Sequence, residues 1–359
     1  MSLEALLPLS DLPPSQELRE LRATLFAAAP HGRAGSTARQ YSRPWACVTE
    51  WATAKGLAVL PMEPRVAALV LTRELQRCYR AKLGPGGVLT MSAAIHFHHW
   101  VRGLPSPTGT PACDLARTVA RRNLAAGRAA RRGATMEEVD AALQALTAAG
   151  TLPSFVVAAM IVLGFYGFLR AGELLGVMWR DVSFSDDHCE VFIEQSKTDQ
   201  ERVGVWVVIA AAEAGSRGIC PVRVLRKLLE AGNYAERDAG DERALLIRAV
   251  SATPRRATGH CLRGPQCGLS YNTALTRCRD VFASLGIRDD FTMHVLRIGG
   301  ATEAARAEVP DRLRMVQGRW RSEVTLRGYT REGQPAQVAV NQAMLALLDK
   351  ADTAVPEFE

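Results

Sequence analysis

Apolar residues recur every three or four positions through most of this sequence, which is the spacing of amphipathic helices. In the first third of the chain this spacing predicts helices over residues 16–29, 36–55, 63–83 and 89–101. The second of them carries aromatic and apolar side chains on one face, at Tyr41, Trp45, Val48 and Trp51. We interpret that face as part of a helical core, in preference to a surface that stacks on bases.

The middle of the sequence has a different pattern. Short apolar, β-branched runs separated by turn residues predict a small antiparallel sheet, with strands over residues 181–184, 189–194 and 203–209. Residues 154–169 are so uniformly apolar that they must be buried. Helical spacing predicts further helices over 136–149, 221–231 and 270–285. Between them we expect a polar loop over 232–241, a short apolar element over 244–250 and an exposed loop over 251–268.

The length and composition of the chain set its domain organisation. A chain of 359 residues with 48% hydrophobic content is long enough for two packed domains. The expected fold class is mainly α, with the small antiparallel β-sheet in the second domain. We expect a flexible tail over 1–15, a helical domain over 16–126, a basic linker over 127–135, a second domain over 136–350 and a tail over 351–359.

The chain carries a moderate excess of positive charge. Its net charge of +7 and pI near 9.1 are compatible with a polyanionic partner but do not require one. Arginines are concentrated around the linker without an acid among them, at Arg117, Arg121, Arg122, Arg128, Arg131 and Arg132. Such a run is either a solvated face or a surface that contacts the DNA backbone, and we favour the second interpretation. In the 251–268 loop, Arg255, Arg256 and Arg263 are weaker candidates for the same role.

Several classes of protein are disfavoured by the sequence. The eight cysteines lack the paired spacing of a zinc site, and we interpret them as reduced thiols. His96, His98 and His99 crowd one predicted helix without partnering carboxylates, so they are expected to be core or surface residues rather than metal ligands. No signal peptide and no apolar run of membrane-spanning length is evident. We therefore expect an intracellular protein without a metal or other cofactor.

The candidate chemistry lies in two segments. In residues 292–331, His294 and Arg297 are three positions apart, so on a helix they share a face and can reach one anion together. Gly299 and Gly300 follow, where the lack of side chains lets another element approach closely. An arginine and a histidine suit a phosphate oxygen, and the lone Tyr329 is a possible nucleophile. The 292–331 segment therefore indicates a phosphate site with a hydroxyl group beside it.

The second segment places a charged pair in an apolar stretch. Arg170 and Glu173 interrupt the buried run three residues apart. A buried arginine must be paired or hold an anion, so two interpretations are open. Either the two side chains form an ion pair inside the core, or Glu173 orients Arg170 toward a phosphate.

Several of these pieces together resemble a known family. The segments HVLRIGGAT and GRW followed by Tyr329, the segment GFLRAGELLGVMWRDV around Arg170, and SKTDQ around Lys197 look like the conserved boxes of the tyrosine recombinases, the phage-integrase family. The resemblance covers roughly residues 134 to 350, and its wording is nearest to recombinases of eukaryotic mobile elements. It implies an integrase-type α+β catalytic domain preceded by a helical domain that binds core DNA. It also moves us to the second interpretation of the Arg170–Glu173 pair.

The resemblance implies a role for each matched residue. Tyr329 would attack a DNA phosphorus and form a 3′-phosphotyrosine link, while Lys197 would give a proton to the leaving 5′ oxygen. His294 would accept a proton, and Arg170 and Arg297 would clamp the non-bridging oxygens, with Glu173 in support. Trp320 stands where most members carry a histidine; its indole N–H can donate to the phosphate but cannot carry a proton.

The expected function follows from that resemblance. The chain would be a site-specific DNA recombinase, an integrase or transposon recombinase that acts on double-stranded DNA, without a membrane partner, in the cytoplasm or nucleoid of a bacterium or phage host, or in a eukaryotic nucleus. It would form a tetramer on two DNA sites through its last helix, where an apolar face is expected at Val340, Met344, Leu347 and Leu348. That face fits packing on its own domain equally well. The alternatives are a type IB topoisomerase, a catalytically silent DNA-binding relative, and a helical protein without a nucleic-acid role.

Overall fold

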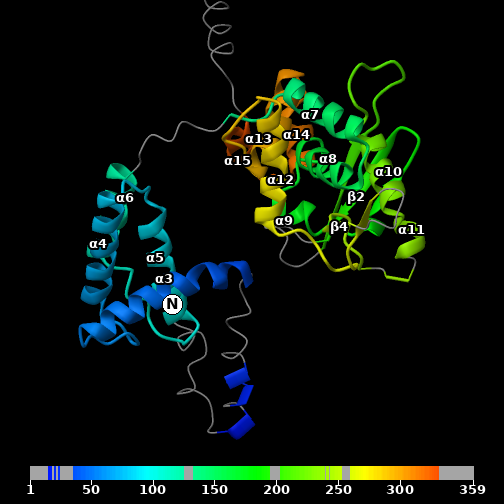
Figure 1. The fold of residues 1–359 in the computed structure, drawn as a ribbon. Coiled ribbons are helices and arrows are strands. Elements are labelled where there is room, and N and C mark those ends of the chain that lie inside the picture. The colour runs from blue at the N-terminus through cyan, green and yellow to red at the C-terminus, as the bar shows by residue number, and fades with distance from the viewer. Residues whose placement is uncertain are drawn as a thin grey trace, which may run out of the picture. The chain divides into compact units, whose positions relative to one another are not determined.

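The structure is a computed structural model in which the chain forms two compact units, Met1–Ala130 and Arg131–Glu359 (Figure 1). Each unit is described by itself. The residues that the structure describes are 15–17, 20, 21, 23, 24, 35–124, 132–194, 203–238, 240, 241, 243–252 and 259–330.

The first unit is helical. Its long helices are α3 (Gly35–Ala54), α4 (Pro64–Arg80), α5 (Gly86–Trp100) and α6 (Pro111–Asn123). The first three confirm the predicted helices, although α4 ends earlier than expected. Helix α6 begins where the Thr110 side chain accepts the backbone N–H of Cys113, a side-chain cap that satisfies a donor of the first turn. Of the predicted helix over 16–29, the described positions within 16–24 are helical and the remainder lies outside the described residues.

The aromatic face of α3 belongs to the core of this unit, as predicted. Val48 is buried, and Trp45 packs against the apolar cluster and stacks on His98 with ring centroids 4.4 Å apart. His99 is fully buried, and its Nε2 accepts the backbone N–H of Met62 at 3.0 Å. Burial lowers the pKa of His99, so it is a neutral core histidine.

The second unit is built around one buried helix (Figure 1). Helix α8 (Leu152–Phe165) is apolar on all sides, and α7 (Met136–Ala149), α10 (Pro221–Gly232), α12 (Tyr271–Ser284) and α13 (Met293–Arg306) pack around it. A helix without a polar face is stable only when neighbours cover every side of it. Thr151 begins α8 with a capping box, and the helix ends at Phe165. The apolar run over 154–169, predicted to be buried, is therefore this central helix and the start of the loop that follows it.

The predicted antiparallel sheet is present. Strands β1 (Val182–Phe184), β2 (His188–Ile193) and β3 (Val205–Ala210) pair in that order, after the short turn η3 (Trp179–Asp181). The register opposes Val191 to Val182 on one side and to Val207 on the other. These valines are buried, so the alternation in the sequence sets which face of the sheet meets the core.

Two expectations for the region after α10 are wrong. Residues 232–241 are not simply a polar loop, because α11 (Tyr234–Arg237) forms there and the Tyr234 ring is fully buried. The adjoining Asp238 pairs with Arg248 in the interior, so a segment whose residues are mostly polar contributes to a buried ion pair. Within 251–268, β5 (His260–Leu262) pairs with β4 (Val250–Ala252), and Leu262 is buried.

The C-terminal part of the unit carries the helices α13, α14 (Asp311–Gly318) and α15 (Glu323–Tyr329). Ser270 caps α12 at the start of the helix predicted over 270–285, and Pro310 immediately precedes α14. The close approach expected at the paired glycines of α13 is also confirmed. A Cβ on Gly299 would lie 2.2 Å from the carbonyl oxygen of Ala134, and one on Gly300 would lie 2.1 Å from that of Phe165. The last helix predicted from the sequence, with an apolar face that includes Val340, lies outside the described residues. No described helix is long and apolar enough to cross a membrane.

Candidate active site

The loop that leaves α8 delivers Arg170 to the start of the short helix α9 (Ala171–Leu174). The Glu173 carboxylate accepts the backbone N–H of Arg170 at 2.9 Å and its Nη1 at 2.7 Å. Burial opposes ionisation of Glu173, but the charge of Arg319 and the bonds from Arg170 outweigh it and lower the pKa of this carboxyl group. Glu173 is therefore an ionised, buried carboxylate that both caps α9 and fixes the Arg170 guanidinium.

Helix α13 brings Arg297 into the same place. Its side chain has 0% exposure, and it donates to the carbonyl oxygens of Phe168 and Gly318. Its Nη1 lies 4.0 Å from Glu173 Oε2. Burial, followed by repulsion from Arg170 and Arg319, lowers the pKa of Arg297 to about 10, so the guanidinium is still charged at neutral pH.

Tyr329 and Trp320 cover this guanidinium. The Arg297 Cζ atom lies 4.8 Å from the centroid of the Trp320 ring and 5.0 Å from that of Tyr329. The two rings are 4.8 Å apart, and the ring of His294 lies 5.1 Å from that of Tyr329. The structure thus gathers four of the predicted side chains, and Arg170 joins them through Glu173.

Two features of this cluster were not expected. The guanidinium predicted to clamp a phosphate is sealed from solvent, whereas His294 on the same helix is exposed. The indole Nε1 of Trp320 is buried without a hydrogen-bond partner in the described part of the chain. The predicted Lys197 lies outside the described residues.

Comparison with known sequences identifies the family. Residues 134–334, more than half of the chain, match the phage integrase family. The chain belongs to the phage integrase family.

Individual relatives of this phage integrase family member are distant. It is 29% identical over 176 residues to an integrase/recombinase xerD homolog of Selenomonas ruminantium, a match that covers 49% of this chain and 47% of that protein. The chain therefore spans about half the length of this relative. A lambda integrase dimer bound to a COC' core site is 16% identical, with a TM-score of 0.48 over 92% of this chain and 84% of that one. The XerH recombinase in a post-cleavage complex is 13% identical, with a TM-score of 0.47 over 78% and 69%.

Sequence reasoning overlooked Arg319. The side chain of this residue is 7% exposed, and its Nη2 donates to Glu173 Oε2 at 2.7 Å. It also ends α14 in the left-handed conformation, with φ 54°. No residue pattern around Gly318 and Trp320 marks this arginine, because its inward direction depends on the left-handed backbone at the end of α14.

The arginines predicted to contact DNA are either bonded within the protein, exposed to solvent, or outside the described residues. Arg117 is occupied by Ser92 Oγ, the Thr108 carbonyl oxygen and Asp114, so it holds the first unit of this phage integrase family member together. Arg132 pairs with Glu138 at the start of α7. Arg121 and Arg122 are exposed on α6. The remaining candidates Arg128, Arg131, Arg255 and Arg256 lie outside the described residues, while Arg263 donates to Ser251 Oγ.

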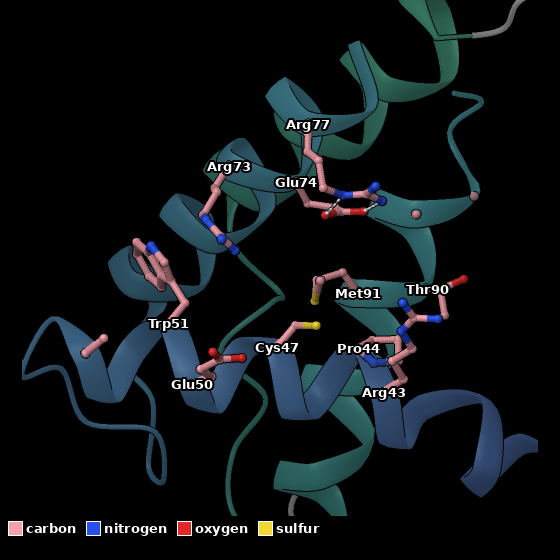
Figure 2. A pocket seen from close by; sticks show the side chains of 13 residues that line it. Arg43, Pro44, Cys47, Glu50, Trp51, Arg73, Glu74, Arg77, Thr90 and Met91 are labelled. Carbon is pink, nitrogen blue, oxygen red and sulfur yellow. Dashed lines mark hydrogen bonds and ion pairs between the residues drawn. The ribbon is translucent and has the colours of Figure 1, made fainter. Parts of the chain in front are cut away.

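The first unit contains a cavity of about 780 Å³ between α3, α4 and α5 (Figure 2). Arg43, Arg73 and Arg77 line it, and Figure 2 shows the Arg77 guanidinium directed at the Glu74 carboxylate. Glu50 also lines the cavity, so its charge is mixed and does not single out an anionic ligand.

Metal chemistry has no evident site in the described residues. They contain no group of three or more His, Cys, Asp or Glu side chains that could hold a metal ion. All eight cysteines are free thiols. The side chains that meet around Arg297 carry guanidinium, imidazole, indole and phenol groups.

Proposed function

We propose that this chain is a site-specific DNA recombinase that cleaves and rejoins strands through a 3′-phosphotyrosine intermediate. The observation that carries the proposal is the meeting of Tyr329, His294 and Trp320 around Arg297, with Arg170 held by the same carboxylate that faces Arg297. A phenol beside one guanidinium group, with a second held by the same carboxylate, is suited to attack on a phosphodiester, because the cations neutralise charge on the non-bridging oxygens.

Each side chain has a part in the proposed reaction. The Tyr329 oxygen forms a bond to phosphorus, the bond to the 5′ oxygen breaks, and the leaving strand keeps a 5′ hydroxyl. His294 accepts the phenolic proton, and Lys197 supplies the proton for the leaving oxygen. The buried Nε1–H of Trp320 donates to the phosphate. The phosphotyrosine link conserves the free energy of the broken phosphodiester bond. A second 5′ hydroxyl can therefore reverse the step and join new ends.

The geometry requires a movement before the reaction. Arg297 cannot touch a phosphate while Tyr329 and Trp320 cover it. Helix α15, which carries Tyr329, has only seven residues, and Leu326 is its only buried residue. A helix this short with a single buried anchor can be displaced at low cost, so we propose that bound DNA moves α15 and opens Arg297.

The partners follow from the same proposal. Double-stranded DNA is the substrate, and the exposed Arg121 and Arg122 contact its backbone. Two duplexes need two pairs of active subunits, so the working form is a tetramer joined through the last helix. The protein acts where its DNA is, in the nucleoid or the nucleus, and the reaction needs no metal ion.

The direct test is trapping on nicked DNA. Inverted repeats that flank the gene supply half-sites, and a nick beside the cleavage point lets the short strand with the 5′ hydroxyl diffuse away. The wild-type protein should become covalently attached to the 3′ phosphate, and Tyr329→Phe should bind equally well without attachment. Tyr271→Phe is the matched control, since Tyr271 is exposed at the start of α12 and should not matter. Attachment by Tyr329→Phe would disprove the assignment.

A further inference from the structure

Arg319 occupies a backbone conformation that does not suit an arginine. It ends α14 with φ 54° and ψ 41°, where its N–H closes the last turn on the Met315 and Val316 carbonyl oxygens. Glycine is the usual residue at such a position, because a Cβ crowds the backbone there. The bonds made by the Arg319 side chain must offset this cost.

Those bonds are numerous and buried. Nη1 donates to the carbonyl oxygens of Gly167 and Gln317, and Nη2 donates to that of Phe168 and to Glu173 Oε2. Both terminal nitrogens of the fork are thus occupied by protein acceptors. Arg319 therefore cannot itself serve as a phosphate ligand without breaking them, and it acts on the site through Glu173.

Glu173 is shared unequally among three guanidinium groups. Its carboxylate is 2.7 Å from Arg170 and 2.7 Å from Arg319, but 4.0 Å from Arg297. In the described part of the chain it is the only acidic group within ion-pair distance of these three. One carboxylate cannot neutralise three cations, so the cluster keeps the excess positive charge that a phosphate needs.

The position of Glu173 decides which arginine stays unneutralised. Oε2 lies 2.7 Å from Arg319 and 4.0 Å from Arg297. A buried carboxylate oxygen that loses a charged partner will turn to another cation within reach. Without Arg319, Oε1 keeps Arg170 and Oε2 keeps the Arg170 backbone N–H at 2.9 Å, so Arg297, at 4.0 Å, is the cation that Oε2 can turn to.

We propose that Arg319 is a positioning residue that holds the Glu173 carboxylate away from Arg297 and so keeps the charge of Arg297 available to a DNA phosphate. This rests on the proposed recombinase function. Arg170 is the guanidinium oriented by Glu173, Arg297 is the one left without a close carboxylate, and Arg319 maintains the difference between them.

If Arg319 only stabilised the fold, variants at this position would give different results from those expected of a positioning residue. Arg319→Gly suits the left-handed backbone but removes the cation, and it should slow covalent attachment to the nicked half-site about 10–100-fold, as expected for sub-ångström misplacement of a phosphate ligand. Arg319→Lys keeps a cation beside Glu173 and should recover most of that rate.

The outcomes separate the two proposals. If the wild-type protein forms no attachment, both fall. If it does, and Arg319→Lys is as slow as Arg319→Gly, only the role of Arg319 falls. A crystal structure of the DNA-free Arg319→Gly protein gives a check that needs no DNA target. Glu173 should move from 4.0 Å to hydrogen-bond distance of Arg297, and an unchanged separation would overturn the inference.

Discussion

At the scale of single residues, the site depends on a balance between one carboxylate and several guanidinium groups. Glu173 is 4% exposed and ionised, and each oxygen is bonded to an arginine. An arrangement of this kind is costly to disturb on one side only, because removal of a partner leaves buried charge without compensation. The unequal number of carboxylates and guanidinium groups also suits the proposed reaction, because a bound phosphate can neutralise the remaining positive charge.

The charge of Glu173 should make stability depend on pH. Its pKa is lowered in the folded protein, so it contributes stability above its unfolded pKa of about 4.3, and this is lost as the pH falls through the folded value. Glu173→Gln should therefore cost about 3–5 kcal/mol at pH 7, and less below about pH 4. Urea unfolding across this range measures the difference. The exposed Glu213→Gln should change stability by less than about 0.5 kcal/mol, and a pH-independent cost at Glu173 would contradict the argument.

Arg297 should matter far more for the reaction than for DNA binding. Arg297→Ala removes a charged donor from the phosphate and should slow attachment about 10²–10³-fold or more. Arg306 lies on the same helix, but it is largely exposed and paired with Glu303, so Arg306→Ala is the control. Single-turnover attachment rates, with binding measured separately, decide the point. Equal rates for the two variants would argue against Arg297 as a phosphate ligand.

Residue types predicted part of this site. Arg170, His294 and Arg297 stood out because they interrupt apolar stretches, and Tyr329 stood out because a phenol beside an arginine–histidine pair is a possible nucleophile. The sealing of Arg297 by two rings could not be predicted, since it depends on how α13, α14 and α15 pack. Arg319 was missed for a related reason, because only the backbone conformation shows that this arginine turns inward at a helix end.

At the scale of elements, prediction succeeded where local signals and burial agree. Helix α7 has a Thr135 cap, a Glu138 partner and Gly150 at its end, and its bounds are those predicted. It failed at α11 and β5, which depend on distant partners. Asp238, directly after α11, pairs with Arg248, and Arg248 donates to the carbonyl oxygen of Arg263, directly after β5. Pairing across the fold cannot be read from a local pattern.

Close packing at α13 gives a prediction at this scale. Gly300→Ala places a methyl group 2.1 Å from a backbone oxygen that cannot swing aside, so it should destabilise the second unit by about 1–3 kcal/mol or more. Gly328→Ala in α15 meets nothing within 4 Å and should be neutral or stabilising by up to about 1 kcal/mol. Thermal unfolding of the two variants compares them. Similar effects at both positions would mean that α13 is not fixed as described.

At the scale of the whole molecule, the two units divide the work that we propose. The second carries the reactive cluster, and the first contributes DNA affinity through exposed arginines on α6. Length and composition predicted two parts, but not which arginines face solvent. Arg117 belongs to the same run as Arg121 and Arg122, yet its guanidinium is committed to the fold.

This difference predicts opposite phenotypes within one arginine run. Arg121→Gln with Arg122→Gln should weaken DNA binding and reduce the salt slope by about 0.9 for each lost phosphate contact, with stability unchanged. Arg117→Gln should instead lower the melting temperature of the first unit. Binding titrations at several salt concentrations, together with thermal unfolding, test both. A salt slope unchanged in the double variant would exclude those two side chains from the DNA surface.

The identity of the atom joined to DNA is the central claim, and peptide mapping tests it most directly. The trapped complex would be digested with protease and nuclease, and the peptide that retains a nucleotide would be sequenced by mass spectrometry. The account predicts a single modified peptide with a 3′ nucleotide on the Tyr329 oxygen. A nucleotide on another side chain, or linkage through a 5′ phosphate, would contradict it.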